Sequence, residues 1–328
     1  MRIAATALAV VIVATVIAAI WIWRDRDNIE DLDWPVAESS IEPGDAVTVT
    51  WLGVTTLLFD DGETQILIDG FFSRIPVIDY LFRRVSTDIA NVNYVMAEYR
   101  INRLAAIVPT HSHFDHAMDV GIVANRSSAV VLGSESTANI ARGERLPVDQ
   151  YQILANGENR QFGDFTITLI VSKHAPVADG AKPWYPGVIT SPLRQPARVG
   201  DWKEGESYSI LVSHPRGVAL IQGSAGFLSD NLKNLSVDVV MLGVGGLSRL
   251  GREYTEQYWK EAVTMTGALR VYPVHYEDFT KPFGEVALFP KIADDVVQTA
   301  DWINDIAIAE DVEVDIQRLP FGKRILLY

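Results

Sequence analysis

The chain has 328 residues, 48% of them hydrophobic, which is enough apolar material for a substantial core. Its formal net charge of -14 disfavours a nucleic-acid surface, since phosphate binding requires clustered Lys and Arg. The absence of cysteine excludes disulfides, thiolate nucleophiles and cysteine-based zinc sites. We therefore expect a folded protein that has no nucleic-acid partner.

The chain begins with a long apolar segment. Residues 3–23 carry no charged side chain and, at about 1.5 Å per residue, span about 31 Å, close to the hydrocarbon thickness of a bilayer. The segment ends in Trp21 and Trp23, followed by Arg24, a boundary that suits the headgroup layer. The alternative is a cleaved signal peptide, whose apolar core is usually about 7 to 15 residues. We predict a transmembrane anchor over residues 1–24, with the lipid bilayer as the partner of residues 3–23.

The basic residues that flank this segment do not settle its orientation, because Arg2 on one side faces Arg24 and Arg26 on the other. A bacterial-style signal anchor would place the body outside the cytoplasm. We therefore predict a single-pass membrane protein with a periplasmic or other extracytoplasmic body. Residues 25–44 are charged and contain proline, which predicts a linker, and residues 45–328 form the predicted folded domain.

Strand and helix patterns are interleaved through both halves of this domain. The expected strands cover residues 47–51, 55–59, 65–69, 104–108, 130–132, 165–172, 207–213, 218–222, 237–242, 271–274 and 312–316. The expected helices cover residues 117–125, 134–142, 254–266 and 294–308, with Ser134 as an N-cap. This order predicts one α/β domain in which two sheets lie face to face with helices outside.

Two further segments show no sustained strand pattern. Residues 71–103 mix aromatic side chains and arginines, and we expect helix and loop there, with a lid as one interpretation. Residues 175–202 are rich in proline and glycine and should form a long surface loop. Ordered loops of this length are usually functional.

The most informative motif is Thr-His-Ser-His-Phe-Asp-His at residues 110–116, directly after the apolar run 104–108. Half of the six histidines of the chain lie here, which disfavours the alternative that they are ordinary surface or core residues. Imidazole and carboxylate groups are ligands for zinc, manganese or iron. We expect a metal site formed by His111, His113, Asp115 and His116.

Two more histidines follow predicted strands. His174 comes after the strand 165–172, and His275 comes after the strand 271–274. Ligands at the ends of separate strands can converge from distant parts of the sequence. We include both residues among the metal ligands, whereas His214 lies in a hairpin turn and is expected to face solvent.

At these positions the chain resembles the metallo-β-lactamase fold superfamily, whose signature His-x-His-x-Asp-His is matched by residues 111–116. The likeness covers about residues 47–280. It implies a four-layer αββα sandwich with the aspartate of an early strand at Asp69 and the third and final histidines at His174 and His275. The stretches at residues 51–53 and 69–74 resemble the branch that contains N-acylphosphatidylethanolamine phospholipase D and ascorbate-6-phosphate lactonase. That branch often has His and Pro where this chain has Val54 and Gly70.

One departure concerns the aspartate that bridges two metals in the family, because the corresponding position here is Ser224. A neutral hydroxyl lacks the charge and the second oxygen of a carboxylate. The resemblance therefore implies one zinc held by His111, His113 and His174 with an open fourth position. The second site would keep Asp115, His116 and His275 without the bridge, and Asp230 is the nearest downstream carboxylate.

The resulting hypothesis is a zinc-dependent hydrolase. Zinc lowers the pKa of bound water from about 15.7 to about 7, and the hydroxide would attack an ester, lactone, amide or phosphodiester. Asp115 would orient or deprotonate this water. The substrate would be a small molecule or a lipid, since residues 71–99 either line an apolar approach or pack on the domain. The alternative is a catalytically impaired, membrane-tethered binding protein with the same fold.

Overall fold

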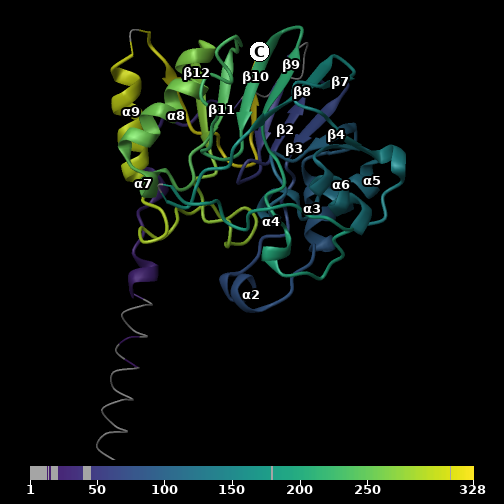
Figure 1. Cartoon of the computed structure of the whole chain (residues 1–328). Helices are drawn as coiled ribbons and strands as arrows, with labels where there is room; N and C mark the ends of the chain where they lie inside the picture. The colour runs from purple at the N-terminus through teal and green to yellow at the C-terminus, as the bar shows by residue number, and fades with distance from the viewer. Residues whose placement is uncertain (1–12, 14, 16–20, 40–45, 179, 311) are drawn as a thin grey trace, which may run out of the picture.

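The computed structural model describes residues 13, 15, 21–39, 46–178, 180–310 and 312–328 (Figure 1). These residues form two seven-stranded sheets, as the α/β prediction with two sheets expected. The first sheet has the order β14 (Arg324–Leu326), β1 (Thr48–Trp51), β2 (Leu57–Asp60), β3 (Gln65–Ile68), β4 (Leu104–Val108), β5 (Val130–Gly133) and β6 (Tyr151–Ile153). The second has the order β13 (Asp315–Ile316), β12 (Arg270–Val274), β11 (Val239–Gly243), β10 (Gly217–Gln222), β9 (Ser207–His214), β8 (Phe165–Ser172) and β7 (Asn159–Phe162).

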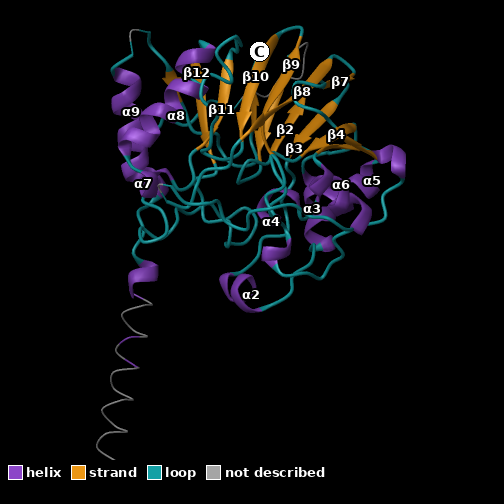
Figure 2. Ribbon diagram, in the orientation of Figure 1, coloured by secondary structure: helices purple, strands orange, loops and turns teal. Residues whose placement is uncertain are grey.

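The longer helices lie on the outer faces of the two sheets (Figure 2). The first sheet is covered by α3 (Ile89–Glu98), α5 (Val120–Ser127) and α6 (Glu135–Gly143). The second is covered by α8 (Arg252–Ala262) and α9 (Val296–Ile308), and the four-residue helix α7 (Leu247–Leu250) packs against both of these helices. The short helices α2 (Val77–Phe82) and α4 (Phe114–Ala117) lie among the loops beyond one end of the sheets. Single 3-10 turns occur at Ile29–Asp31, Val148–Gln150, Val199–Asp201 and Thr264–Thr266.

The alternation of side chains along β3 shows how the layers are held together. Ile66 and Ile68 belong to the apolar core between the sheets, whereas Leu67 points the other way, into the core under α3, α5 and α6. A strand buried on both faces is continuously apolar. The same holds for β4, whose residues Leu104–Val108 lead directly into the histidine motif.

The directions of the strands place the predicted metal ligands at one edge of the two sheets. The first three strands are an antiparallel meander, and β4 runs parallel to β3. In the second sheet β11 is parallel to both β10 and β12, and β8 and β10 are each antiparallel to β9. Consequently β3, β4, β8, β10 and β12 each end near the candidate site.

The main local differences from the sequence expectation have physical reasons. The predicted helix 117–125 is observed as α5, which begins three residues later; the buried residue before it, Asp119, accepts hydrogen bonds from Phe72 N and Ser73 N, both at 2.7 Å. Strands β6, β7 and β14 were not expected, since short edge strands carry a weak apolar pattern. The predicted strand 312–316 is reduced to Asp315–Ile316.

The predicted single-pass membrane location is contradicted. In the part of the chain that the structure describes, no helix is both long enough and apolar enough to cross a bilayer. Most of the predicted anchor, residues 3–23, lies outside the described residues, and residues 21–24 are helical. The extracytoplasmic location of the body depended on that anchor and is not retained.

The described part of the predicted linker packs against the body. Leu32, Trp34 and Ala37 are 4%, 2% and 4% exposed and belong to the main apolar core. Trp34 Nε1 donates a hydrogen bond to Asn304 Oδ1 on α9 at 3.0 Å. The predicted domain boundary at residue 45 stays a prediction.

Candidate metal centre

The predicted ligands meet in two groups of three at the shared edge of the sheets. The first group contains His111, His113 and His174, and the second contains Asp115, His116 and His275. Within each group one ligand atom from every side chain lies within 4.8 Å of the others. The structure therefore brings together all six side chains that the sequence nominated.

The first group joins the loop after β4 to the loop after β8. His111 Nε2 lies 2.9 Å from His113 Nδ1, and the ring centroids of His111 and His174 are 4.6 Å apart. His174 Nδ1 donates to the carbonyl oxygen of Ala175 at 2.7 Å, which leaves Nε2 as its lone-pair nitrogen. The buried Nε2 of His113 has no hydrogen-bond partner among the described residues. An unpaired nitrogen in this position fits a metal ligand.

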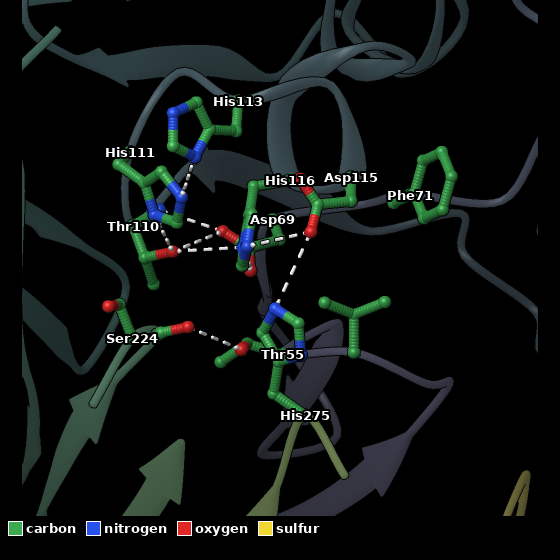
Figure 3. Close-up of polar contacts among 12 residues, drawn as sticks. Thr55, Asp69, Phe71, Thr110, His111, His113, Asp115, His116, Ser224 and His275 are labelled. Carbon is green, nitrogen blue, oxygen red and sulfur yellow. Dashed lines mark hydrogen bonds and ion pairs between the residues drawn. The ribbon is translucent and has the colours of Figure 1, made fainter. Parts of the chain in front are cut away.

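The second group centres on the carboxylate of Asp115 (Figure 3). Asp115 Oδ2 lies 3.5 Å from His116 Nε2 and 3.5 Å from His275 Nε2. Apart from the contact with Asp115, His116 Nε2 is buried without a hydrogen bond in the described part of the chain, as is His275 Nδ1. Buried imidazole nitrogens without partners are costly, so this group also fits a cation.

Asp69 anchors the histidine motif, residues 110–116, but belongs to neither group of ligands. Its Oδ2 lies 2.6 Å from His116 Nδ1, and its Oδ1 accepts hydrogen bonds from the N and Oγ1 of Thr110 at 2.7 and 3.0 Å (Figure 3). This contact fixes the proton of His116 on Nδ1 and turns Nε2 toward Asp115. Asp69 itself has a positive φ of 57°, as does His275 at 60°.

Burial and neighbouring charges set the protonation of the cluster. Burial lowers the pKa of His113 to about 4 and that of His174 to about 3, so both rings are neutral lone-pair donors at neutral pH. Burial also lowers the pKa of His116, but Asp69 and Asp115 outweigh it and the net shift is upward. For Asp115, burial raises the pKa, and His116 and His275 reverse this, so the carboxylate stays ionised.

Ser224 lies beside the two groups of ligands, as the resemblance implied, but its hydroxyl forms a hydrogen bond with another part of the chain. Its Oγ accepts a hydrogen bond from Ala175 N at 2.8 Å, next to His174. A Cβ on Gly223 would lie 2.1 Å from Thr110 Oγ1, so only glycine allows this loop to approach the histidine motif. Asp230 lies outside both groups, and its backbone N donates to Glu261.

A cavity of about 860 Å³ opens onto both groups. Its polar lining includes members of both groups, namely His113, Asp115, His174 and His275. Most of the remaining wall is apolar or aromatic and includes Tyr80, Leu81, Phe114, Trp184, Phe279 and Phe289. A cavity of this size holds a drug-sized organic molecule.

Several expectations about individual side chains need revision. His214 was expected to face solvent, but its side chain is only 6% exposed, because it packs on Phe165 with ring centroids 5.1 Å apart. Phe71 and Phe72 are fully buried and do not line the approach, whereas Tyr80 and Leu81 do. The role of Thr110 could not be predicted from the sequence, because it depends on the distant Asp69, whereas Trp184 lies in the loop 175–202 that was expected to be functional.

The chain matches the family model described as Metallo-beta-lactamase superfamily over residues 49–233, more than half of its length. It is similar to a UPF0173 metal-dependent hydrolase of Heliobacterium modesticaldum, with 22% identity over 266 residues that cover 76% of this chain and 91% of that protein. A second UPF0173 metal-dependent hydrolase, from Azorhizobium caulinodans, is 26% identical over 144 residues. That match covers 42% of this chain and 54% of the relative, so it spans about half of the relative's length.

Among solved structures, the chain is similar to isothiocyanate hydrolase from Delia radicum gut bacteria. The TM-score is 0.51 with 15% identity, and the match covers 85% of this chain and 99% of that one. At this identity the likeness concerns the fold.

Proposed function

We propose that this chain, which belongs to the metallo-beta-lactamase superfamily, is a metal-dependent hydrolase whose reaction takes place at the two groups of ligands. The observation that carries the proposal is that side chains of both groups line a large and mostly apolar cavity. We further propose an ester, lactone or phosphodiester as the bond that is cleaved.

The donor set supports zinc as the metal. Three neutral imidazoles with an open fourth position are a catalytic zinc arrangement, and His111, His113 and His174 provide it. A zinc ion held there would supply Lewis acidity and an acidified water for hydrolysis. We propose this group as the principal site, because Ser224 offers no carboxylate to bridge to the second.

We propose that Asp115 is the residue that takes part in proton transfer. Its carboxylate lines the cavity and its pKa is held low by His116 and His275, in spite of the opposing effect of burial. It can therefore accept a hydrogen bond from an attacking water and orient it. If the second group binds no metal, His116 and Asp115 together form an acid–base pair, with His116 held by Asp69.

The apolar wall supports a substrate with a hydrophobic part, such as a lipid or another amphiphile. The long loop between β8 and β9 contributes Trp184 and Tyr185, and α2 contributes Tyr80 and Leu81. Tyr80 Oη and Tyr185 Oη lie 2.8 Å apart, so these two segments meet over the metal centre. They provide the enclosure that excludes water from a reacting group.

The test begins with metal content. The full chain, purified without chelator, should contain at least one zinc per molecule by elemental mass spectrometry, and it should hydrolyse at least one of a set of aryl esters, lactones and bis-aryl phosphates. His113→Ala should lose the metal and at least about 100-fold in turnover, since it removes a ligand. Normal turnover in this variant would refute the proposal.

His214→Ala is the matched control, because it removes a largely buried histidine that lies outside both groups. Its metal content should equal that of the wild type. A chain that binds metal but cleaves none of these bonds would favour the alternative of a binding protein, for which the missing carboxylate at Ser224 is the supporting observation.

A further inference from the structure

Arg249 is one of the two arginines that line the cavity. It lies on α7 (Leu247–Leu250), is exposed at the mouth of the cavity, and lines it together with Asp115 and His275. Within the described residues its guanidinium forms no hydrogen bond or ion pair with another group.

The guanidinium lies close to the metal centre. A Cβ built on Gly246 would lie 2.9 Å from Arg249 Nη2, so the side chain folds back over that glycine. The neighbouring Gly245 abuts His275, since a Cβ there would lie 3.1 Å from His275 Nδ1. Only two adjacent glycines therefore separate the cation from a candidate metal ligand.

The nearest acid is engaged by other groups. Asp294 Oδ2 accepts a hydrogen bond from Gly246 N at 2.7 Å, and Oδ1 accepts one from Ser248 Oγ at 2.5 Å. Burial raises the pKa of Asp294 and the charge of Arg249 opposes this, so the two side chains attract each other at longer range without forming an ion pair among the described residues. Asp115, the other acid of the wall, faces His116 and His275. A guanidinium that lines a cavity and whose hydrogen-bond donors are unused among the described residues favours an anionic ligand group.

The rest of the wall defines what such a ligand must carry besides its charge. Leu81, Phe114, Trp184 and Phe279 line the cavity with apolar surface. Arg24 is the other cation of the wall and lies on the N-terminal helical turn. The cavity thus combines one guanidinium beside the metal centre with a predominantly apolar enclosure.

We infer that Arg249 binds an anionic group of the substrate beside the metal centre, so that the substrate class is an anionic amphiphile. This inference rests on the proposed hydrolase function, because it names the class of substrate for that same site. The recognised group is a carboxylate, sulfonate or phosphate that accepts hydrogen bonds from a planar guanidinium. The hydrophobic part occupies the aromatic enclosure.

The experiment measures binding and therefore does not depend on turnover. The metal-loaded full chain is titrated by calorimetry with decane-1-sulfonate, a poor metal ligand, and with decan-1-ol, its neutral counterpart, both below micelle formation and at low salt. Decane-1-sulfonate should bind more tightly than decan-1-ol. Methanesulfonate should bind far more weakly, since each buried methylene contributes about fourfold in affinity.

Three variants test whether the tighter binding of decane-1-sulfonate depends on Arg249. Arg249→Gln should weaken sulfonate binding by about 10- to 100-fold and change decanol binding less than about twofold. Arg249→Lys should restore part of the loss, because the charge remains while the planar fork is lost. Arg252→Gln is the matched control: this exposed arginine belongs to α8 and already pairs with Glu256 and Asp305, so neither ligand should be affected.

Equal binding of the sulfonate and the alcohol, or sulfonate binding that Arg249→Gln leaves unchanged, would overturn the inference. A loss that appears in Arg24→Gln and not in Arg249→Gln would overturn the assignment to Arg249. Hydrolysis of 4-nitrophenyl decanoate is measured in parallel. Absence of that activity would count against the proposed function, while the selective loss in Arg249→Gln would still support an anion subsite.

Discussion

Arg74 and Glu277 form a buried ion pair, in which Arg74 Nη1 lies 3.1 Å from Glu277 Oε1 and the side chains are 6% and 2% exposed. Glu277 Oε1 also accepts a hydrogen bond from Val54 N at 2.6 Å. The carbonyl of Val54 in turn accepts one from His275 N at 3.0 Å. The pair therefore connects the loop after β3 to the backbone of a candidate metal ligand.

The turn between β1 and β2 needs this support. Val54 has a φ of 49°, a strained conformation for a β-branched residue. A Cβ on the preceding Gly53 would lie 1.8 Å from Arg74 Nη2, so glycine is required for the guanidinium to approach. The ion pair and the turn thus determine one another and position His275.

Glu277→Ala should destabilise the chain strongly, because it leaves the buried charge of Arg74 uncompensated. We expect a loss of about 3–5 kcal/mol in the free energy of unfolding, measured by urea denaturation of the metal-free protein. Glu256→Ala is the control, since Glu256 forms an exposed pair with Arg252 and should lose less than about 1 kcal/mol. Similar losses in the two variants would show that the buried pair does not stabilise this turn.

Asp69→Asn should weaken metal binding without removing a ligand. The amide no longer holds the Nδ1 proton of His116 with a charged partner, and such changes typically weaken metal affinity by about 10- to 100-fold. Chelator competition followed by metal analysis measures the change. Asp61→Asn is the control, because Asp61 faces a histidine outside the centre, with Oδ2 3.7 Å from His214 Nε2. Unchanged metal retention in Asp69→Asn would contradict this role.

Ser224→Asp should raise the number of metals per chain. The new carboxylate would add a charge between the two ligand groups, which the hydroxyl lacks. Ser224→Ala should leave the metal content unchanged and cost about 1 kcal/mol of stability through the lost hydrogen bond from Ala175 N. Elemental mass spectrometry distinguishes the variants, and an unchanged count in Ser224→Asp would mean that this position does not face the shared ligand space.

Asp60 should contribute a pH-dependent part of the stability far from the metal centre. Burial raises its pKa, but hydrogen bonds from Gln65 Nε2, Gly62 N and Arg103 outweigh this, and the net pKa lies below 3.8. Because the pKa is lower in the folded state, the stabilisation is present above about pH 4 and is lost as the pH falls through the folded value.

Asp60→Asn should therefore flatten the decline of stability between about pH 5 and pH 2, and it should be less stable than the wild type at pH 7 by about 1–3 kcal/mol. Urea unfolding across this pH range measures both effects. Parallel pH profiles for wild type and variant would show that Asp60 has the same pKa in the folded and unfolded states.

Expectations from the sequence succeeded where the determining contacts are local. The strand 165–172 was predicted with its observed bounds, because its alternation of apolar and polar side chains reports directly on burial. Ser134 caps α6 as expected, with its Oγ accepting from Thr137 N at 3.3 Å. The edge strand Asn159–Phe162 was missed, because its polar residues are stabilised by pairing with β8 and carry no apolar pattern.

A metal centre could be predicted from the sequence, because His111, His113, Asp115 and His116 lie within six consecutive residues and their ligand chemistry is evident without tertiary information. The folded structure was needed to show how His174 and His275 complete two separate groups, that Asp69 orients His116, and that the side chain of His214 packs on Phe165. It also decided that Arg249 reaches the cavity. These relationships depend on which strand ends converge at one edge, and that convergence results from the order of the strands in each sheet and from the packing of the two sheets around a common core.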